Sequence, residues 1–176
     1  SNVNMSWLGP EFYISPTGLP EQYVVALAAG HDEYLAIFGE DHGPSTSSVW
    51  GRRVAGDGGL RPFINIAHNT GLNRIEPAVA FGDGGRYLVP WRFVAGAYPA
   101  WDIQGRTVRA GQNSPEGPQF NIDNTSAAQK VPGVACAPSG PCLVVYEDEW
   151  PGGGNEWEIR GRLVGHRRAF LPAMRR

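Results

Sequence analysis

Aromatic and amide side chains gather in the loops of this 176-residue chain, where they have the composition of a sugar-binding surface. Aromatic rings stack on the apolar faces of sugars, and amides bind sugar hydroxyls. Tyr98 and Trp150 stand beside glycine and proline and are the stronger ligand candidates, whereas Trp101 and Trp157 adjoin strands, where packing at the rim is the preferred interpretation. The candidate ligand or partner residues are Tyr98, Trp150, Trp101, Trp157, Asn69 and Asn124.

Acid and base residues form one loose group along the sequence. His42 and His68 are expected to share a loop face with Glu40 and Asp41. No His-x-His, His-Glu-x-x-His or Gly-x-Ser-x-Gly pattern occurs, so zinc and nucleophile-elbow chemistry have no signature here. The acidic run at 147–149 lacks the spacing of a calcium loop and is interpreted as a solvated loop or as a partner of Arg160 or Arg162. The sequence therefore predicts a chain without catalytic residues, metal or cofactor.

Composition excludes two classes of partner. A net charge of −2 argues against a broad nucleic-acid face, which needs concentrated basic charge. No apolar stretch approaches the 18 residues that a membrane-spanning helix requires. A glycine and proline content of 24 and 15 residues indicates many tight turns, and no helical period persists, so the chain is expected to be all-β.

A module of about fifty residues occurs three times, and it must position the candidate residues. An apolar block recurs as Tyr34–Phe38, Tyr87–Trp91 and Cys142–Tyr146. A Gly-Arg pair follows each block, at Gly51-Arg52, Gly105-Arg106 and Gly161-Arg162. The repeated arginines are interpreted as inter-blade or inter-strand ion pairs, because a residue present in every unit belongs to the unit's construction.

Each unit is expected to hold four antiparallel strands. In the middle unit these cover 77–81, 86–92, 102–108 and 118–122. The second strand is apolar on both faces, which predicts a sheet covered on both sides, as in a propeller blade. The repeated glycine allows a neighbouring backbone or aromatic ring to approach closely, and Pro90 requires a bulge or a broken ladder bond. A β-trefoil or a β-prism is the alternative, since both also close with three repeats.

The middle unit reads Tyr-Leu-Val-x-Trp, then Asp-Ile-x-Gly-Arg-x-Val, then Gly-Pro-x-Phe-x-Ile. These motifs resemble the propeller-type repeats of large secreted bacterial proteins, over residues 9–165. The resemblance implies blades and implies little about activity.

Residues 1–176 are expected to form a single repeat domain, with units at about 10–66, 67–122 and 123–171 and a basic tail at 166–176. Three blades do not close a ring, because propellers have 4–8. Strand-like segments at both ends leave one strand too many, so assembly with a second copy or a larger complex is expected. The assembly residues are Phe12, Ile14, Phe170 and Leu171.

Cys136 and Cys142 flank a turn at positions that an antiparallel hairpin places opposite each other, which predicts a disulfide. A disulfide implies an extracytoplasmic location: secreted, periplasmic or at the cell surface.

These observations favour a non-catalytic extracytoplasmic binding or structural subunit that assembles through its end strands. The alternative is a lectin-like carbohydrate-binding module, and a glycan-processing enzyme comes third. The expected partners are a second copy, a larger protein complex or a carbohydrate.

Overall fold

The chain is all-β over the residues that the computed structural model describes, which are 9–16, 21–43, 46–68, 72–95, 101–149 and 156–165. None of these residues lies in a helix, so no helix in this part of the chain is able to cross a membrane. The strands are β1 (Gln22–Ala29), β2 (Glu33–Asp41), β3 (Ser47–Ala55), β4 (Leu60–Ala67), β5 (Asn73–Ile75), β6 (Ala80–Gly82), β7 (Arg86–Val94), β8 (Trp101–Arg109), β9 (Pro115–Asp123), β10 (Gln129–Cys136), β11 (Cys142–Glu149) and β12 (Trp157–Val164).

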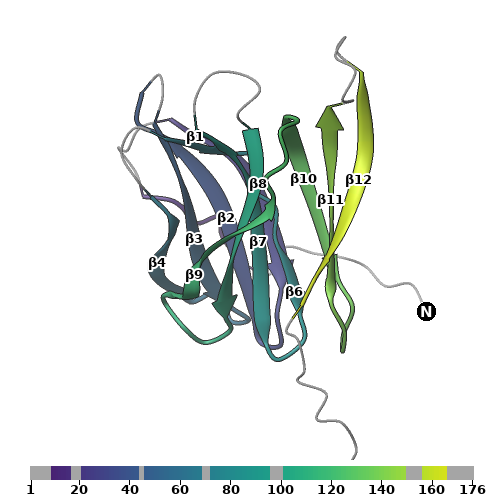
Figure 1. Ribbon diagram of the computed structural model, residues 1–176. Helices are drawn as coiled ribbons and strands as arrows, with labels where there is room; N and C mark the ends of the chain where they lie inside the picture. Colours follow the sequence, from purple (N-terminus) through teal and green to yellow (C-terminus); the bar gives the residue numbers. More distant parts are fainter. Residues whose placement is uncertain are drawn as a thin grey trace, which may run out of the picture.

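Three antiparallel sheets follow one another along the chain. Sheet A has the order β1-β2-β3-β4, sheet B has β5-β7-β8-β9 with β6 also paired to β7, and sheet C has β10-β11-β12. Sheet B contacts both other sheets, so it lies between them (Figure 1). Consecutive strands pair in every sheet, as expected for repeated units joined by short turns.

The expectation of three four-stranded units is met only by sheet A. In sheet B the first strand is divided into β5 and β6, and sheet C has three strands among the described residues. The segment at 10–14, expected to be a strand, is not assigned to one. It instead lies against sheet A, where Arg52 donates hydrogen bonds to the carbonyls of Tyr13 and Ile14 at 3.3 and 2.9 Å.

Pro90 explains the division of the first strand in sheet B. β6 pairs with β7 as far as Leu88, and β5 pairs with it from Arg92 onward. Between them, Pro90 has no N–H to donate, and its carbonyl accepts one hydrogen bond from the Ala78 N–H at 2.9 Å. The broken ladder predicted at Pro90 is confirmed.

Apolar side chains fill the two seams between the sheets. We call the face of a sheet that points toward the next sheet along the chain its forward face, and the opposite face its back face. One cluster joins Leu35, Ile37 and Val49 on the forward face of sheet A to Tyr87 and Trp91 on the back face of sheet B. A second cluster joins sheet B to sheet C through Leu88, Ile103, Ile122, Val144 and Tyr146. Burial on both faces thus accounts for the continuous apolar runs of β2 and β7.

The repeated arginines bridge consecutive units, but through backbone carbonyls rather than the expected ion pairs. Arg106 donates from Nη1 to the carbonyl of Ile66 at 2.9 Å, and Arg162 does so to Ile122 at 2.5 Å. Arg162 alone also approaches a carboxylate, with Nη2 at 3.7 Å from Asp123 Oδ1. A guanidinium has five N–H donors in a fixed fork, which suits this role of joining one sheet to the next.

The repeated glycines make room for side chains of their own sheet. A Cβ on Gly105 would lie 2.8 Å from Ile122 Cδ1, and one on Gly51 would lie 3.0 Å from Ile37 Cδ1. A close approach is present at both glycines, but the approaching groups are isoleucine side chains of the same sheet rather than the expected backbone or aromatic ring.

Gly105→Ala is expected to lower the free energy of unfolding by about 1–3 kcal/mol, because the added methyl overpacks the core at Ile122. Urea denaturation measures this loss. The comparison is the double variant Gly105→Ala/Ile122→Val, in which a smaller side chain makes room for the added methyl. Gly111, on a turn, is not a suitable control, because its φ of 80° makes alanine unfavourable there for a separate reason. Partial recovery of stability in the double variant supports overpacking, and an additive further loss contradicts it.

The predicted disulfide between Cys136 and Cys142 is present, and these two residues pair directly across the β10–β11 hairpin. Both cysteines also pack against the apolar cluster between sheets B and C. The bond therefore joins the two strands of sheet C that lie nearest to the core of that seam.

Candidate functional site

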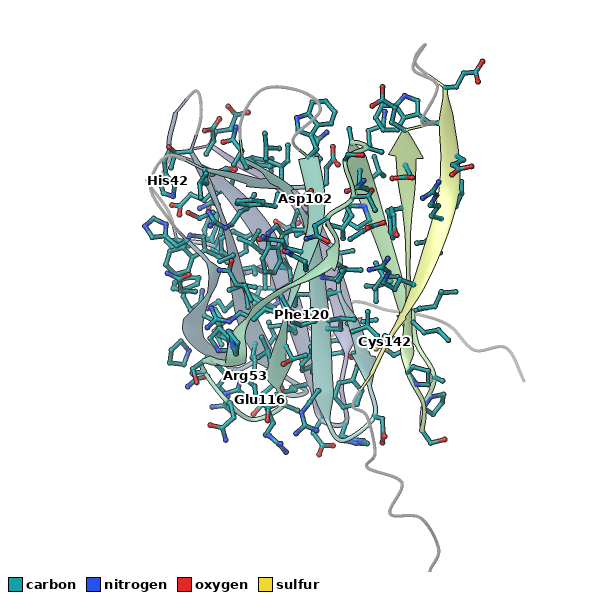
Figure 2. The ribbon with its side chains drawn as sticks, in the orientation of Figure 1. His42, Arg53, Asp102, Glu116, Phe120 and Cys142 are labelled. Carbon is teal, nitrogen blue, oxygen red and sulfur yellow. A yellow bond between two sulfur atoms is a disulfide. The ribbon has the colours of Figure 1, made fainter. Side chains whose placement is uncertain are left out.

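Polar side chains of interest gather at one end of the three sheets. We call this the loop end: it is where β2, β7 and β11 finish and β3, β8 and β12 begin. His42 and Asp102 lie toward this end, whereas Arg53 and Glu116 lie toward the opposite end (Figure 2).

The first group at the loop end lies on sheet A and contains a buried carboxylate. Glu40 is 4% exposed, and its Oε2 lies 3.2 Å from His42 Nε2. The same nitrogen lies 3.1 Å from Ser48 Oγ, and Ser48 Oγ lies 2.6 Å from His68 Nδ1. The structure therefore brings together three of the four residues expected to form the acid-base group, Glu40, His42 and His68, and it adds Ser48.

This group is not arranged as a nucleophile with its base. A serine–histidine–acid relay needs the two nitrogens of one imidazole to face the serine and the acid separately. Here a single nitrogen of His42 faces both Ser48 and Glu40. The arrangement is instead a hydrogen-bonded chain that runs from the exposed His68 through Ser48 and His42 to the buried Glu40.

The second group at the loop end contains two carboxyls of sheet B, Asp102 and Asp123, which the strand register places on opposite faces of the sheet. Asp102 is the second residue of β8 and is partly exposed. Asp123 is the last residue of β9 and is 1% exposed. Burial, and secondarily the negative charge of Asp123, raises the pKa of the Asp102 carboxyl. A carboxyl whose pKa is raised beside a second carboxylate is an arrangement used for proton donation.

Asp123 is held by the neighbouring sheet. Tyr146, on the back face of sheet C, donates its hydroxyl to Asp123 Oδ2 at 2.5 Å. Burial, followed by the hydrogen bond to Asp123, raises the pKa of the Tyr146 hydroxyl, so this phenol stays protonated and remains a donor. Asp123 Oδ1 has no hydrogen-bond partner among the described residues and faces only Arg162, at 3.7 Å. The seam between sheets B and C therefore fixes the position of Asp123.

A fourth acidic residue, Asp148, is fully buried at the loop end of sheet C. Gln129 donates from Nε2 to Asp148 Oδ1 at 2.9 Å, and Arg160 Nε lies 2.9 Å from Oδ2. Asp148 belongs to the acidic run that was interpreted as a solvated loop or a partner of Arg160 or Arg162. Its pairing with Arg160 is confirmed, and its burial shows that the solvated-loop alternative is wrong.

Three of the sequence-predicted binding residues lie at the loop end. Asn124 is exposed directly after Asp123. Trp101 precedes Asp102, and the Arg92 guanidinium lies 4.8 Å from the centroid of the Trp101 ring. Lys130 Nζ lies 3.8 Å from the centroid of the Trp157 ring. Of the remaining predicted residues, Tyr98, Trp150, Asn69, Phe170 and Leu171 lie outside the described part of the chain.

The carboxyl pair was not selected from the sequence, although part of its signal was visible. Asp102 occupies a position that is acidic in the second and third units and is Ser48 in the first. Asp123 stands where the first sheet has the buried Ala67. Neither pattern indicates that the two carboxyls interact, because that depends on the register of β8 with β9.

The described residues include no cluster of three or more histidine, cysteine, aspartate or glutamate side chains arranged to hold a metal ion.

An exposed ion-pair network occupies the opposite end of sheet B. Arg86 Nε lies 2.5 Å from Glu116 Oε2, and Arg109 Nη2 lies 2.9 Å from Oε1. The hydrogen bonds from Arg86 and then Arg109 lower the pKa of Glu116 to about 2.

Because the folded-state pKa of Glu116 is depressed, its contribution to stability is present above the ordinary value of 4.5 and is lost as the pH falls toward 2. Solvent screening of this half-exposed group limits the contribution to about 1 kcal/mol or less. Chemical denaturation of the protein and of Glu116→Gln at pH 6 and pH 2.5 measures it. The difference in stability between the two proteins is expected to shrink at pH 2.5, and a constant difference contradicts the assignment.

Comparison with known proteins adds three solved structures, all with propeller-type folds. No family model matches the chain, and no curated protein matches it. An endo-arabinase from Bacteroides thetaiotaomicron superposes with a TM-score of 0.62 and 9% identity over 86% of this chain and 60% of its own. An α-L-arabinofuranosidase from Podospora anserina, solved with cellotriose, superposes with a TM-score of 0.52 and 11% identity. The match covers 82% of this chain and 54% of that enzyme. The catalytic domain of a Coprinopsis cinerea α-L-arabinofuranosidase superposes with a TM-score of 0.52 and 11% identity. The match covers 83% of this chain and 55% of that domain.

These similarities show the fold class. The chain has the propeller-type arrangement of antiparallel sheets found in glycoside hydrolases whose own rings have five blades. It spans less than two thirds of the length of each of them. The expected blade architecture is supported over the trefoil and the prism.

The expectation of a non-catalytic subunit is corrected by the same comparison. All three structures that share the fold are glycan-hydrolysing enzymes, so the fold is one that carries catalysis. The sequence-based expectation relied on the absence of familiar catalytic motifs, and such an absence does not exclude catalysis.

Proposed function

We propose that this protein processes glycans by hydrolysing glycosidic bonds, and that its substrates contain arabinofuranose. The observation that supports the proposal is the partly exposed carboxyl of Asp102 at the loop end, whose pKa is raised by burial and secondarily by the charge of Asp123. The substrate class follows the similar structures, whose names are those of two arabinofuranosidases and an endo-arabinase.

In this proposal Asp102 is the proton donor. Glycosidic cleavage requires a carboxylic acid that is still protonated at the working pH and that gives its proton to the leaving oxygen. Asp102 has access to solvent, whereas Asp123 is buried. Burial is the main cause of the raised pKa of Asp102, and Asp123 adds to it as a positioning residue that Tyr146 holds in place.

The surroundings of Asp102 suit a sugar. Trp101 and the exposed Asn124 are the sequence neighbours of Asp102 and Asp123, and they bring an aromatic ring and an amide to the loop end of sheet B. Aromatic and amide groups beside a carboxyl provide the stacking and the hydroxyl contacts that carbohydrates use. The disulfide between Cys136 and Cys142 supports an extracytoplasmic location, where glycan polymers are encountered.

Hydrolysis of defined substrates tests the proposal. The protein is incubated with 4-nitrophenyl α-L-arabinofuranoside and with linear arabinan oligosaccharides, and with 4-nitrophenyl β-D-xylopyranoside as a control. We expect release of nitrophenol or arabinose from the furanosides and none from the xyloside. A protein that unfolds cooperatively, and so is folded, yet cleaves neither furanoside contradicts the proposal.

A further inference from the structure

The two seams between the sheets are built in the same way. On the forward faces of sheets A and B, equivalent positions of the second strand carry Leu35 and Leu88, which are 0% and 3% exposed. Equivalent positions of the third strand carry Val49 and Ile103, both 0% exposed. Each of these residues is covered by the back face of the following sheet.

The forward face of sheet C presents the same residue types, and no described part of the chain covers it. Leu143, which is equivalent to Leu35 and Leu88, is 44% exposed, and Ile159, which is equivalent to Val49 and Ile103, is 72% exposed. Val145 and Leu163 lie on the same face and are 37% and 68% exposed. The four side chains form one apolar surface across β11 and β12, which we call the forward surface. Monomeric proteins rarely expose such a contiguous surface without a partner.

One part of the back face of sheet A is exposed in a complementary way, whereas Ala36 and Phe38 on the same face are only 2% and 4% exposed. Leu27 and Tyr34 are 62% and 45% exposed, although Val79 and Tyr87 at the equivalent positions of sheet B are 9% and 0% exposed. Leu27 and Tyr34 form what we call the back surface. Among the described residues, large exposed hydrophobic side chains occur at these two surfaces, in the neighbouring segment at Phe12 and Tyr13, and at Val131.

The segment at 12–14, beside the back surface, contacts sheet A in the same way as the last strand of each sheet contacts the sheet that follows it. Arg106 and Arg162 each donate to the carbonyl of an isoleucine in the last strand of the preceding sheet. Arg52 makes the same hydrogen bond to the carbonyl of Ile14. Ile14 therefore stands, relative to sheet A, where Ile66 stands relative to sheet B.

We infer that the forward surface of one molecule docks on the back surface of a second copy of this chain. The two surfaces are the two halves of the seam that the chain forms twice within itself, so each has the residue types that the other requires. Sheet C ends at β12, whose outer edge has no partner strand among the described residues. Docking places residues 12–14 of the second copy beside that edge, at the position that β4 and β9 hold in the other sheets.

Such an interface is heterologous, because two different surfaces meet, and it leads either to a closed ring or to an open filament. The inference does not depend on glycan hydrolysis, since no residue of the proposed site lies on either surface.

Sedimentation equilibrium over a range of concentrations tests for association. Ile159→Arg/Leu163→Arg breaks the forward surface, and Leu27→Arg/Tyr34→Arg breaks the back surface. We expect the unaltered protein to associate and each variant alone to associate at least about a hundredfold more weakly, because unpaired charge in a desolvated apolar contact is strongly unfavourable. Ser139→Arg adds the same charge to an exposed turn of sheet C and is expected to change nothing.

Mixing the two variants gives the decisive measurement. Each retains one intact surface, so the mixture is expected to form a one-to-one dimer that grows no further, with the affinity of the unaltered interface. Circular dichroism and thermal unfolding of each variant establish that it is folded. A strictly monomeric unaltered protein overturns the inference. So does a back-surface variant that still associates by itself, since that indicates contact between two forward surfaces. A mixture of folded variants that remains monomeric overturns it as well.

Discussion

Asp102→Asn is expected to lower kcat/KM on arabinofuranosyl substrates by about a hundredfold to ten-thousandfold, the usual contribution of a positioned general acid. Asparagine keeps the size of the side chain but has no proton to donate. A raised pKa keeps the Asp102 carboxyl protonated to a higher pH than usual, so this group sets the alkaline limb of the pH–rate profile. That limb is expected to disappear in the variant. The measurement is kcat/KM between pH 4 and pH 9.

Asp123→Asn separates a positioning role from a catalytic one. Removing the charge of Asp123 lowers the pKa of Asp102, so the alkaline limb is expected to move to lower pH while activity below that limb is largely retained. Asp57→Asn, in the exposed turn between β3 and β4, is the matched control and is expected to leave the profile unchanged. Full activity of Asp102→Asn, with an unaltered alkaline limb, contradicts the assignment of the proton donor.

Trp91→Ala is expected to lower the free energy of unfolding by about 3–5 kcal/mol, the usual range for removing a fully buried large aromatic side chain. Trp91 is 0% exposed and belongs to the cluster that joins sheet A to sheet B. The loss combines the removal of apolar surface with a cavity that the surrounding strands do not close. Urea denaturation followed by circular dichroism measures it.

Two further tryptophan variants serve as comparisons for Trp91→Ala. Trp91→Phe is expected to cost less than Trp91→Ala, because it retains most of the ring and removes an indole N–H that has no hydrogen-bond partner among the described residues. Trp157→Ala removes a half-buried ring beneath Lys130 at the loop end and is expected to cost about 1 kcal/mol. If Trp91→Ala destabilises the protein no more than Trp157→Ala does, the seam between sheets A and B does not carry the stability assigned to it.

Local sequence patterns predict much of the architecture. The recurrence of Tyr34–Phe38 as Tyr87–Trp91 and Cys142–Tyr146 predicts the central strands β2, β7 and β11. These predictions succeed because strand pairing within one unit uses neighbours in sequence, and because a proline or a hairpin cysteine pair acts on its nearest partners. The break at Pro90 and the Cys136–Cys142 bond are of this kind.

The candidate site was not predictable in the same way. The sequence directed attention to loop aromatics and to the histidines near Glu40, and it treated the repeated acidic position as secondary. The pKa of Asp102 is raised by its own burial and by Asp123, which lies twenty-one positions away and is held in turn by Tyr146 of the next sheet. Electrostatic coupling depends on distance and burial, and neither is encoded in the spacing of residues along the chain.

The sequence by itself determined the recurring central strands and the hairpin disulfide, because these rest on residues close together along the chain. Only the tertiary structure decided which of three equivalent positions is covered. Leu35, Leu88 and Leu143 are the same residue at the same place in the repeat, yet the first two are buried and the third is 44% exposed. Burial is a property of what lies across a seam, and for sheet C no described part of the chain lies there.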